Sequence, residues 1–428
     1  MFYRVDMAAL AVTKEQCVQY QGLGGRGLSL RIVAEAVNPN THPLGGENKL
    51  ALATGLLAGT GAPNAGRLSV SAKSPLTGMV KESNAGGEMG TKLGRLGIRG
   101  IIVEGLPPED TAYVIRVSAN GLLIETMPEL KGLTISAAVA RLQGISGPAA
   151  AIGCIGPAGE NKMASACIGF TGRDGSPDRQ AGRGGLGAVM GSKGLKAIVV
   201  DDSGAPGVSF ADEAAFRAGA QKLIRVLQAR SAAGQTLAGY NGDRPDRLCS
   251  AGCMIRCPQG YPAKPDEVAA GGLKKASRRS LGTSLEIDNL DDIVLMNRLC
   301  NDYGVDTVEM GDALRVAIEA GIAQSGNSQA AIRLIHEMGK ATPLGRILGA
   351  GGEAAGKVFG VKWAAAVKKT GAGDEDPAAA ALINAAGLCR FAVAAVLENP
   401  DALAGIVEMC NARYGWNKTT EEYINMGN

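Results

Sequence analysis

The chain has 428 residues, enough for roughly two or three domains, and its 44 Lys and Arg against 41 Asp and Glu give a formal net charge of +3. This balance argues against nucleic acid or a membrane surface as a partner, and an aromatic content of 4% weakens the case for base stacking. Glycine is abundant, with 62 residues, and no collagen period accounts for it. We therefore expect glycines at tight turns and where the backbone approaches another group closely.

The chain shows no apolar signal region and no apolar run of membrane-spanning length, so we expect a cytoplasmic protein without a membrane span. Nine cysteines in such a chain suit a reducing compartment and metal binding better than a disulfide framework.

Residues 1–205 combine short apolar runs with irregular Gly/Pro connections, a pattern typical of a mainly β domain with a few helices. Two segments in it, Gly25–Ala36 and Ile135–Arg141, have helical spacing. The predicted strands are Leu50–Leu57, Leu68–Ala72, Gly100–Glu104, Tyr113–Val117, Leu122–Glu125 and Ala197–Val200.

Residues 206–428 are rich in Ala, Leu and Ile at helical spacing. We expect an α+β fold, in which a Gly-rich, mainly β N-terminal domain over 1–205 is followed by helical domains, two in number, over 206–428. The Pro-, Gly-, Lys- and Arg-rich stretch 258–285 is predicted to be a loop. The predicted helices are Ala211–Ala229, Asp288–Tyr303, Met310–Ala323, Gln329–Met338, Gly351–Val358, Ala378–Ala386 and Ala402–Tyr414.

Four Gly-rich segments of the N-terminal half mix glycine with Arg or Asn; they are Gly22–Gly27, Gly59–Ser69, Glu82–Gly90 and Gln180–Lys193. Such loops suit an anionic ligand, because backbone N–H groups come close where no Cβ interferes and an Arg can pair with phosphate. The alternative is turn glycines beside structural ion pairs. None of the four has the spacing of a nucleotide-binding motif.

The segment Leu248–Pro258 carries Cys249, Cys253 and Cys257, spaced four residues apart, and Cys389 is a fourth candidate far downstream. Four thiolates can hold zinc or an iron–sulfur cluster, and the spacing alone leaves both open, together with ordinary buried thiols. The remaining cysteines are interpreted as buried thiols; they are Cys17, Cys154, Cys167, Cys300 and Cys410.

Taken together, these motifs resemble the aldehyde:ferredoxin oxidoreductase family, tungsten or molybdenum bis-pterin enzymes with a 4Fe–4S cluster. The resemblance runs along nearly the whole chain and is closest to a less characterised branch. Besides the cysteine run it rests on L-G-G-R-G-L (23–28), P-L-G-G-E-N-K-L (43–50), G-R-L-S-V-S-A-K-S-P-L-T-G (66–78), E-S-N-A-G-G (82–87), A-G-R-G-G-L-G-A-V-M-G-S-K (181–193), C-N-D-Y-G-V-D-T (300–307) and G-L-C-R-F-A (387–392).

The resemblance implies a set of pterin contacts in the Gly-rich loops and in two later motifs. Asn301 and Asn384 stand where similar enzymes have Asp, which keeps an acceptor but removes a charge. The implied cluster ligands are Cys249, Cys253, Cys257 and Cys389, and Mg²⁺ bridging the pterin phosphates is a further expectation. The implied pterin residues are Arg67, Asn84, Gly86, Ala181, Gly182, Arg183, Gly184, Asn301, Val305, Asp306, Asn384, Leu388 and Cys389.

The activity implied by the resemblance is oxidation of an aldehyde to a carboxylic acid, or the reverse, with electrons passing through the cluster to ferredoxin or an iron–sulfur partner subunit. We also expect a homodimer. The alternative is a non-catalytic scaffold of the same family that binds the cofactor or transfers electrons.

We expect four parts of the family to have no counterpart: segments between Glu286 and Ile287, between Val361 and Ala378 and between Gly239 and Cys249, and the usual C-terminal tail. The first two carry the family's active-site Glu and His; Glu286 matches a preceding, non-catalytic Glu. His42 and His336 are interpreted as surface or packing residues, so the catalytic residues stay unassigned. The abrupt junctions favour a longer coding sequence over a minimal paralogue.

Overall fold

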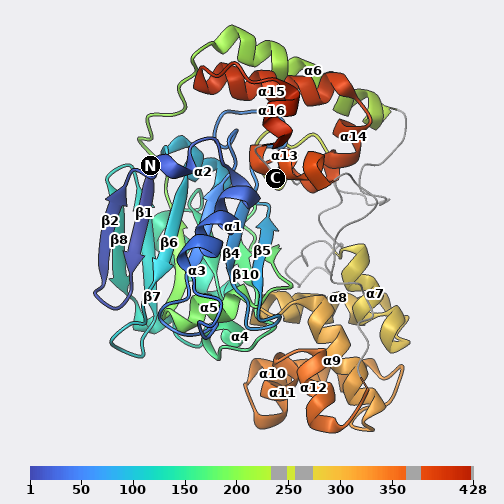
Figure 1. Ribbon diagram of the computed structural model, residues 1–428. Coiled ribbons are helices and arrows are strands. Elements are labelled where there is room, and N and C mark those ends of the chain that lie inside the picture. The colour runs from blue at the N-terminus through green and yellow to red at the C-terminus, as the bar shows by residue number, and fades with distance from the viewer. Residues whose placement is uncertain (233–247, 256–272, 363–376, 426–428) are drawn as a thin grey trace.

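The computed structural model describes residues 1–232, 248–255, 273–362 and 377–425 and shows a β-sheet body beside two groups of helices (Figure 1). The strands of the body are β1 (Phe2–Asp6), β2 (Ala11–Glu15), β3 (Leu50–Thr54), β4 (Leu68–Lys73), β5 (Val80–Ala85), β6 (Gly100–Glu104), β7 (Tyr113–Ser118), β8 (Gly121–Thr126), β9 (Ala151–Cys154), β10 (Ile168–Phe170), β11 (Arg179–Ala181) and β12 (Leu195–Val200). Its helices are α1 (Gly25–Ala36), α2 (Met89–Arg95), α3 (Ile135–Ser146), α4 (Pro157–Glu160) and α5 (Leu186–Ser192).

The strands form two six-stranded sheets, in the orders β2-β1-β6-β3-β4-β5 and β11-β10-β9-β12-β7-β8. Neighbouring strands run antiparallel except β1 beside β6 and β7 beside β12, which run parallel. The edge strands β5 and β11 of the two sheets contact each other. The opposite edge strands, β2 and β8, also contact each other, so the sheets meet along both edges.

Side-chain alternation explains how the sheets pack. In β3, Leu50 and Leu52 enter the core shared by the two sheets, whereas Ala51 and Ala53 lie against α1. Strand β12 alternates in the same way, with α3 covering its outer face. Each sheet thus has the other sheet on one face and a helix on the other.

The sequence predicted some of these elements closely, since Gly25–Ala36 and Gly100–Glu104 coincide with α1 and β6. The strand predicted over Leu50–Leu57 is too long, because the chain turns away after Thr54 and the N–H of Leu56 bonds to the carbonyl of Ala385 at 2.9 Å. The polar edge strand β5 was missed because it lacks the apolar alternation of a half-buried strand. The other missed strands are β1, β2, β9, β10 and β11.

The second half of the described chain is helical, as predicted, and forms two groups with separate cores. The chain leaves the first group after α6, builds the second from α7 to α12, and returns at α13 (Figure 1). The helices are α6 (Glu213–Ala232), α7 (Lys275–Leu281), α8 (Leu290–Tyr303), α9 (Thr307–Glu319), α10 (Ser328–Gly339), α11 (Pro343–Gly349), α12 (Gly352–Phe359), α13 (Pro377–Ala386), α14 (Val393–Leu397), α15 (Pro400–Tyr414) and α16 (Thr420–Asn425).

The loop predicted over 258–285 is wrong for its last part, where α7 and a 3-10 turn at Thr283–Leu285 form. Ser280 and Leu281 are buried there, and the Ser280 hydroxyl donates to the carbonyl of Val308 on α9 at 3.2 Å. Tertiary packing thus makes a polar sequence helical. The α+β fold is confirmed, and no helix among the described residues is long and apolar enough to cross a membrane.

Candidate functional site

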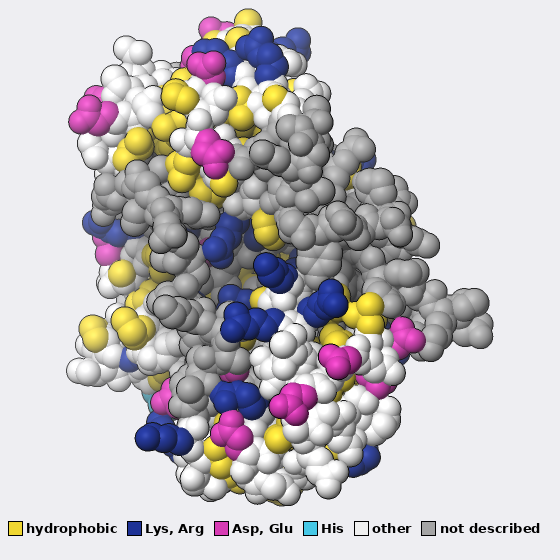
Figure 2. Space-filling model, turned by 90° about the vertical axis from the view of Figure 1, so that its right-hand side faces the viewer, with side chains coloured by type: hydrophobic (Ala, Val, Ile, Leu, Met, Phe, Trp, Pro, Cys, Tyr) yellow, Lys and Arg dark blue, Asp and Glu magenta, His cyan; other side chains and the backbone are white. Residues whose placement is uncertain are grey.

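Positive side chains cluster where the two sheets meet and the helices approach them, and we call this region the charged cleft. Lys274 lies near Arg179 and Arg67, and Lys81 lies near Arg183. The Ser83 hydroxyl on β5 donates to the carbonyl of Gly182 after β11 at 2.6 Å, which closes the joint between the sheets. On the face shown in Figure 2, Lys and Arg side chains gather around a central hollow. Positive charge of this kind attracts an anionic ligand.

Arg67 and Asn84 form the first part of the site. The Arg67 side chain donates from Nε to the Asn84 side-chain oxygen, and from Nη2 to the Asn84 carbonyl at 2.9 Å. Because β4 pairs with β5, the two residues leave neighbouring strands side by side. A Cβ on Gly86 would lie 2.8 Å from Arg67 Nη1 and 3.8 Å from the sulfur of Cys249. Glycine at this position therefore leaves room for the guanidinium beside the cysteine.

Arg183 and Asp306 form the second part. Arg183 has a left-handed backbone, with φ of 59°, and its N–H donates to the Asp306 carboxylate at 3.1 Å. The same carboxylate caps α9 by accepting from the N–H groups of Val308 and Glu309. A Cβ on Gly182 would lie 2.2 Å from Asp306 Oδ2, so only glycine lets the loop reach this helix end.

The segment 384–389 packs on the loop between β3 and β4. The Cys389 N–H donates to the carbonyl of Asn64 at 2.9 Å, and the Arg67 N–H donates to the carbonyl of Gly387 at 3.1 Å. A Cβ on Gly55 would lie 2.2 Å from the Cα of Gly387. Gly24 and Gly25 face the same segment equally closely. Glycines of the first Gly-rich segment therefore serve contact between two parts of the chain.

The predicted pterin residues thus fall into two places. One lies around β5, the start of β4, the end of β11 and the end of α8, and the other is segment 384–389 at the end of α13. Arg67 belongs to both, since its side chain binds Asn84 and its backbone binds Gly387. Val305 is fully buried and forms a bridge with Ala166, so its role in the described structure is packing.

Three of the four predicted cluster cysteines, Cys249, Cys253 and Cys389, are buried in one apolar cluster with residues of α6, α13 and α15; Cys257 lies outside the described residues. The segment that carries Cys249 is held by Glu88, whose carboxylate accepts from the Ala251 N–H at 2.9 Å. No single-ion site of three or more Cys, His, Asp or Glu occurs among the described residues. Cluster ligands stand farther apart than the ligands of one ion, because each binds a different iron.

The surroundings shift the pKa values of Cys249 and Cys389 in opposite directions. A hydrogen bond from Cys253 lowers the pKa of Cys249 to about 5, and Arg179 and Arg67 add to this effect. Burial raises the pKa of Cys389 above its ordinary value, and Arg67 opposes the shift. Arg67 thus acts on cysteines from two segments about 140 residues apart in the sequence, and it favours the thiolate form that binds metal.

Sequence reasoning missed the pair of Asp178 and Arg179 at the start of β11. Their side chains form a buried ion pair at 3.0 Å, and Arg179 acts electrostatically on both Cys249 and Cys389. Burial raises the pKa of the Asp178 carboxyl, which Arg179 counteracts. Lys274, before α7, contributes a further positive charge near Arg179 and Arg67. No spacing signal in the sequence links these residues.

The structure also places the remaining single residues. The Glu286 carboxylate accepts from the Ser325 hydroxyl at 2.7 Å. His336 bonds to the Tyr303 hydroxyl at 2.8 Å, and His42 accepts from the Leu44 N–H in a turn. Of the cysteines read as buried thiols, Cys17 is half-buried and the others are buried; they are Cys154, Cys167, Cys300 and Cys410.

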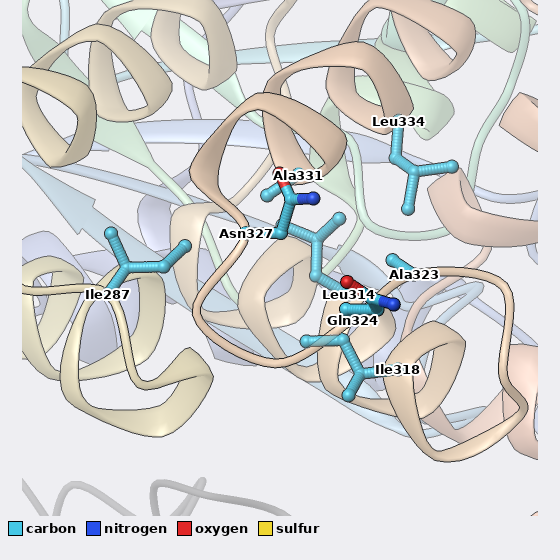
Figure 3. A pocket seen from close by; sticks show the side chains of 8 residues that line it. All are labelled: Ile287, Leu314, Ile318, Ala323, Gln324, Asn327, Ala331 and Leu334. Carbon is cyan, nitrogen blue, oxygen red and sulfur yellow. The ribbon is translucent and has the colours of Figure 1, made fainter.

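A separate cavity among α9, α10 and the loops beside them is not a candidate ligand-binding site. Figure 3 shows the eight side chains that line it, most of them apolar. Its one amide cap, Asn327, accepts from the Ala330 N–H at 3.0 Å and starts α10. It leaves no space for a water molecule. It is a small gap in the packing between the helices.

The charged cleft fits a large anionic cofactor beside a cysteine-bound metal group. Two buried polar atoms beside it, Asn64 Nδ2 and Glu82 Oε1, have no hydrogen-bond partner, whereas Asp178 Oδ1 and Arg179 Nε pair with each other at 3.0 Å. Glycine at 86 and at 182 lets Arg67 and Asp306 pack against these loops, because a Cβ would lie 2.8 Å from Arg67 Nη1 and 2.2 Å from Asp306 Oδ2. Buried polar groups normally find partners, so the two unpartnered atoms point to a bound group.

Fold and cleft together define an α+β protein with a positively charged candidate site, and comparison with known proteins gives its family. Sequence models of the aldehyde ferredoxin oxidoreductase family match in two parts, the N-terminal domain at residues 2–202 and domains 2 and 3 at residues 188–380. The chain therefore belongs to this family, and it is an oxidoreductase.

Individual proteins agree. A tungsten-containing aldehyde ferredoxin oxidoreductase of Pyrococcus horikoshii is 29% identical over 512 positions, which cover 95% of this chain and 82% of that protein. Its counterpart from Pyrococcus furiosus is 32% identical over 358 positions, covering 74% and 58%. The active-site complex BamBC of benzoyl coenzyme A reductase, solved with 1,5-dienoyl-CoA, has the same fold, with a TM-score of 0.82 at 18% identity over 100% of this chain and 86% of that one.

The alignment with the P. horikoshii protein spans 512 positions, more than the 428 residues of this chain. That relative therefore carries segments for which this chain has no counterpart, in agreement with the gaps inferred from the motifs. A longer coding sequence stays a prediction, and the intact mass of the purified protein tests it.

Proposed function

We propose that the protein oxidises an aldehyde to a carboxylic acid, R-CHO + H2O → R-COOH + 2e⁻ + 2H⁺, or catalyses the reverse reaction. The observation that carries the proposal is the position of Arg67. Its side chain is fixed on Asn84 in the charged cleft, and its charge acts on Cys249 and Cys389. One side chain thus links the predicted cofactor site to the predicted cluster site.

The proposed cofactor is a tungsten or molybdenum bis-pterin, with Mg²⁺ between its phosphates. Arg67 and Arg183 would neutralise the phosphates, and Gly86 and Gly182 would let the ligand approach the backbone. The remaining proposed contacts are Asn84, Ala181, Gly184, Asn301, Val305, Asp306, Asn384, Leu388 and Cys389. When bound, this cofactor supplies the two-electron chemistry at the metal.

The proposed cluster is 4Fe–4S, held by Cys249, Cys253, Cys257 and Cys389. Its role is to pass single electrons to ferredoxin or to an iron–sulfur subunit of a larger complex. Cys389 lies within the second pterin motif, next to Leu388, which makes the path between the two groups short.

Metal analysis of anaerobically purified protein, grown with tungstate or molybdate, tests the proposal together with an aldehyde-dependent viologen reduction assay. We expect about four iron atoms and one tungsten or molybdenum per chain, and aldehyde-dependent reduction of the dye. Zinc alone, without iron or pterin, would overturn it.

The missing Glu and His favour a second function, a non-catalytic scaffold that binds the cofactor. Positioned proton transfer contributes about 10²- to 10⁴-fold to a rate, and the two histidines of the sequence bond elsewhere, His42 to the Leu44 N–H and His336 to the Tyr303 hydroxyl. Full metal and pterin content without turnover of any aldehyde tested would favour the scaffold over the enzyme.

A further inference from the structure

Asn64, in the loop between β3 and β4, joins the two segments that carry the described cysteines. Its N–H donates to the carbonyl of Gly252 at 3.0 Å, and its own carbonyl accepts from the Cys389 N–H at 2.9 Å. The side chain is 2% exposed, and φ is 57°, a left-handed value that Asn tolerates better than most residues. The Gly-rich segment Gly59–Ser69 contains this residue, but the sequence assigned it no role of its own.

The side-chain amide of Asn64 has one orientation. Its Oδ1 accepts from the Met254 N–H at 2.7 Å, and a flipped amide would set two donors against each other. The amide nitrogen Nδ2 is therefore the atom that does not bond to Met254, and it is buried without a hydrogen-bond partner. A buried donor without an acceptor costs roughly 1–3 kcal/mol, so an acceptor is expected to complete it.

The residues that bond to Asn64 point to sulfur as that acceptor, because two of the predicted cluster cysteines lie at or beside them. Cys253 stands between Gly252 and Met254, both of which bond to Asn64, and Cys389 bonds to its carbonyl. Sulfur atoms of an iron–sulfur cluster accept N–H bonds, and such bonds help to set its reduction potential. They raise the potential because they stabilise the charge that the reduced cluster gains.

We propose that Asn64 is a positioning residue for the cluster. Its backbone and Oδ1 hold the Cys249–Cys253 segment against Cys389, and its Nδ2 donates a hydrogen bond to a sulfur of the cluster or of a ligating cysteine. The proposal rests on the proposed function, because it requires the iron–sulfur cluster at these cysteines.

Two variants separate the hydrogen bond from the backbone role. Asn64→Asp keeps the acceptor for Met254 but replaces the Nδ2 donor by a charged oxygen, and Asn64→Gly keeps the left-handed backbone without a side chain. Asn38→Asp is the matched control, since Asn38 is exposed and its Oδ1 accepts from the Asn40 N–H at 2.9 Å. It lies near Lys73, at the far end of β4 from Arg67.

The readout is the midpoint potential of the cluster in anaerobic redox titrations followed by electron paramagnetic resonance. We expect a shift to more negative potential in Asn64→Gly, a larger shift in Asn64→Asp because of its charge, and none in Asn38→Asp. Wild-type potential in both Asn64 variants at full iron content would overturn the proposal while leaving the proposed function intact. Absence of iron from the wild-type protein would instead overturn the proposed function.

A measurement on the wild-type protein covers the case in which the variants lose the cluster. Asparagine labelled with ¹⁵N should give a nitrogen coupling in pulsed resonance spectra of the reduced cluster. A coupling is the expected result, and its absence at full iron content would contradict the hydrogen bond.

Discussion

Arg67 is the residue whose charge reaches both parts of the proposed site. We expect Arg67→Ala to lower the affinity for the pterin cofactor tenfold or more, because a charge-assisted contact contributes about 1.5–3 kcal/mol. Tungsten or molybdenum content per chain measures the loss. Arg31→Ala removes an arginine that is 64% exposed on α1 and is the control. Equal metal content in the two variants would return the loop to a structural role.

Buried thiols give a second prediction at the residue scale. Burial raises the pKa of Cys154 and of Cys410 to about 12. Iodoacetamide at pH 8 should therefore leave both unmodified in the folded protein and label them in urea, which peptide mass spectrometry detects. Rapid labelling of either cysteine under native conditions would show that its burial is incomplete.

The same shifts set a pH dependence. The folded pKa lies above the unfolded value of 9.0, so the stabilisation is complete below pH 9 and is lost as the pH rises toward about 12. For each of the two cysteines, the free energy of unfolding falls by roughly 1.4 kcal/mol per pH unit in this window. Urea titrations at pH 9 and pH 10 should show a smaller decrease for Cys410→Ala than for the wild type.

At the scale of elements, the contact between the β3–β4 loop and segment 384–389 depends on glycine. Gly55→Ala places a Cβ 2.2 Å from the Cα of Gly387, and backbone cannot move aside as a side chain can. We expect a destabilisation of about 1–3 kcal/mol and lower iron retention, since Cys389 lies in this segment. Gly144→Ala, in α3 with open space around its Cβ, should be neutral or stabilising. Denaturant melts and iron assays compare the two.

At the scale of the whole molecule, the chain leaves the first helical group after α6, forms the second group and returns at α13. Cluster-binding cysteines before and after the second group would therefore link distant parts of the chain. Cys253 and Cys389 are separated by the whole second group, α7 to α12. Removal of iron by a chelator under anaerobic conditions should lower the melting temperature by several degrees, because metal binding contributes to folding free energy. An unchanged melting temperature after complete iron loss would argue against this link.

The sequence by itself determined the organisation of the chain. Periodicity placed α1, β6 and the helical second half, because apolar spacing records which face of an element is buried. Glycine loops and cysteine spacing pointed to an anionic cofactor and a metal site. Glycine allows close approach of the backbone to a ligand, and closely spaced thiolates can bind a metal. These patterns can be recognised from the sequence because each of them spans only a few neighbouring residues.

Only the tertiary structure decided which of these residues meet. The polar edge strand β5 forms because it pairs with β4, and the polar segment of α7 is helical because it packs on α9. Asn64 and the Asp178–Arg179 pair joined the site because distant segments converge on them. Their roles depend on partners about 70 to 325 residues away in the sequence. No local pattern encodes such contacts, because burial and charge arise from the assembled surroundings rather than from neighbours along the chain.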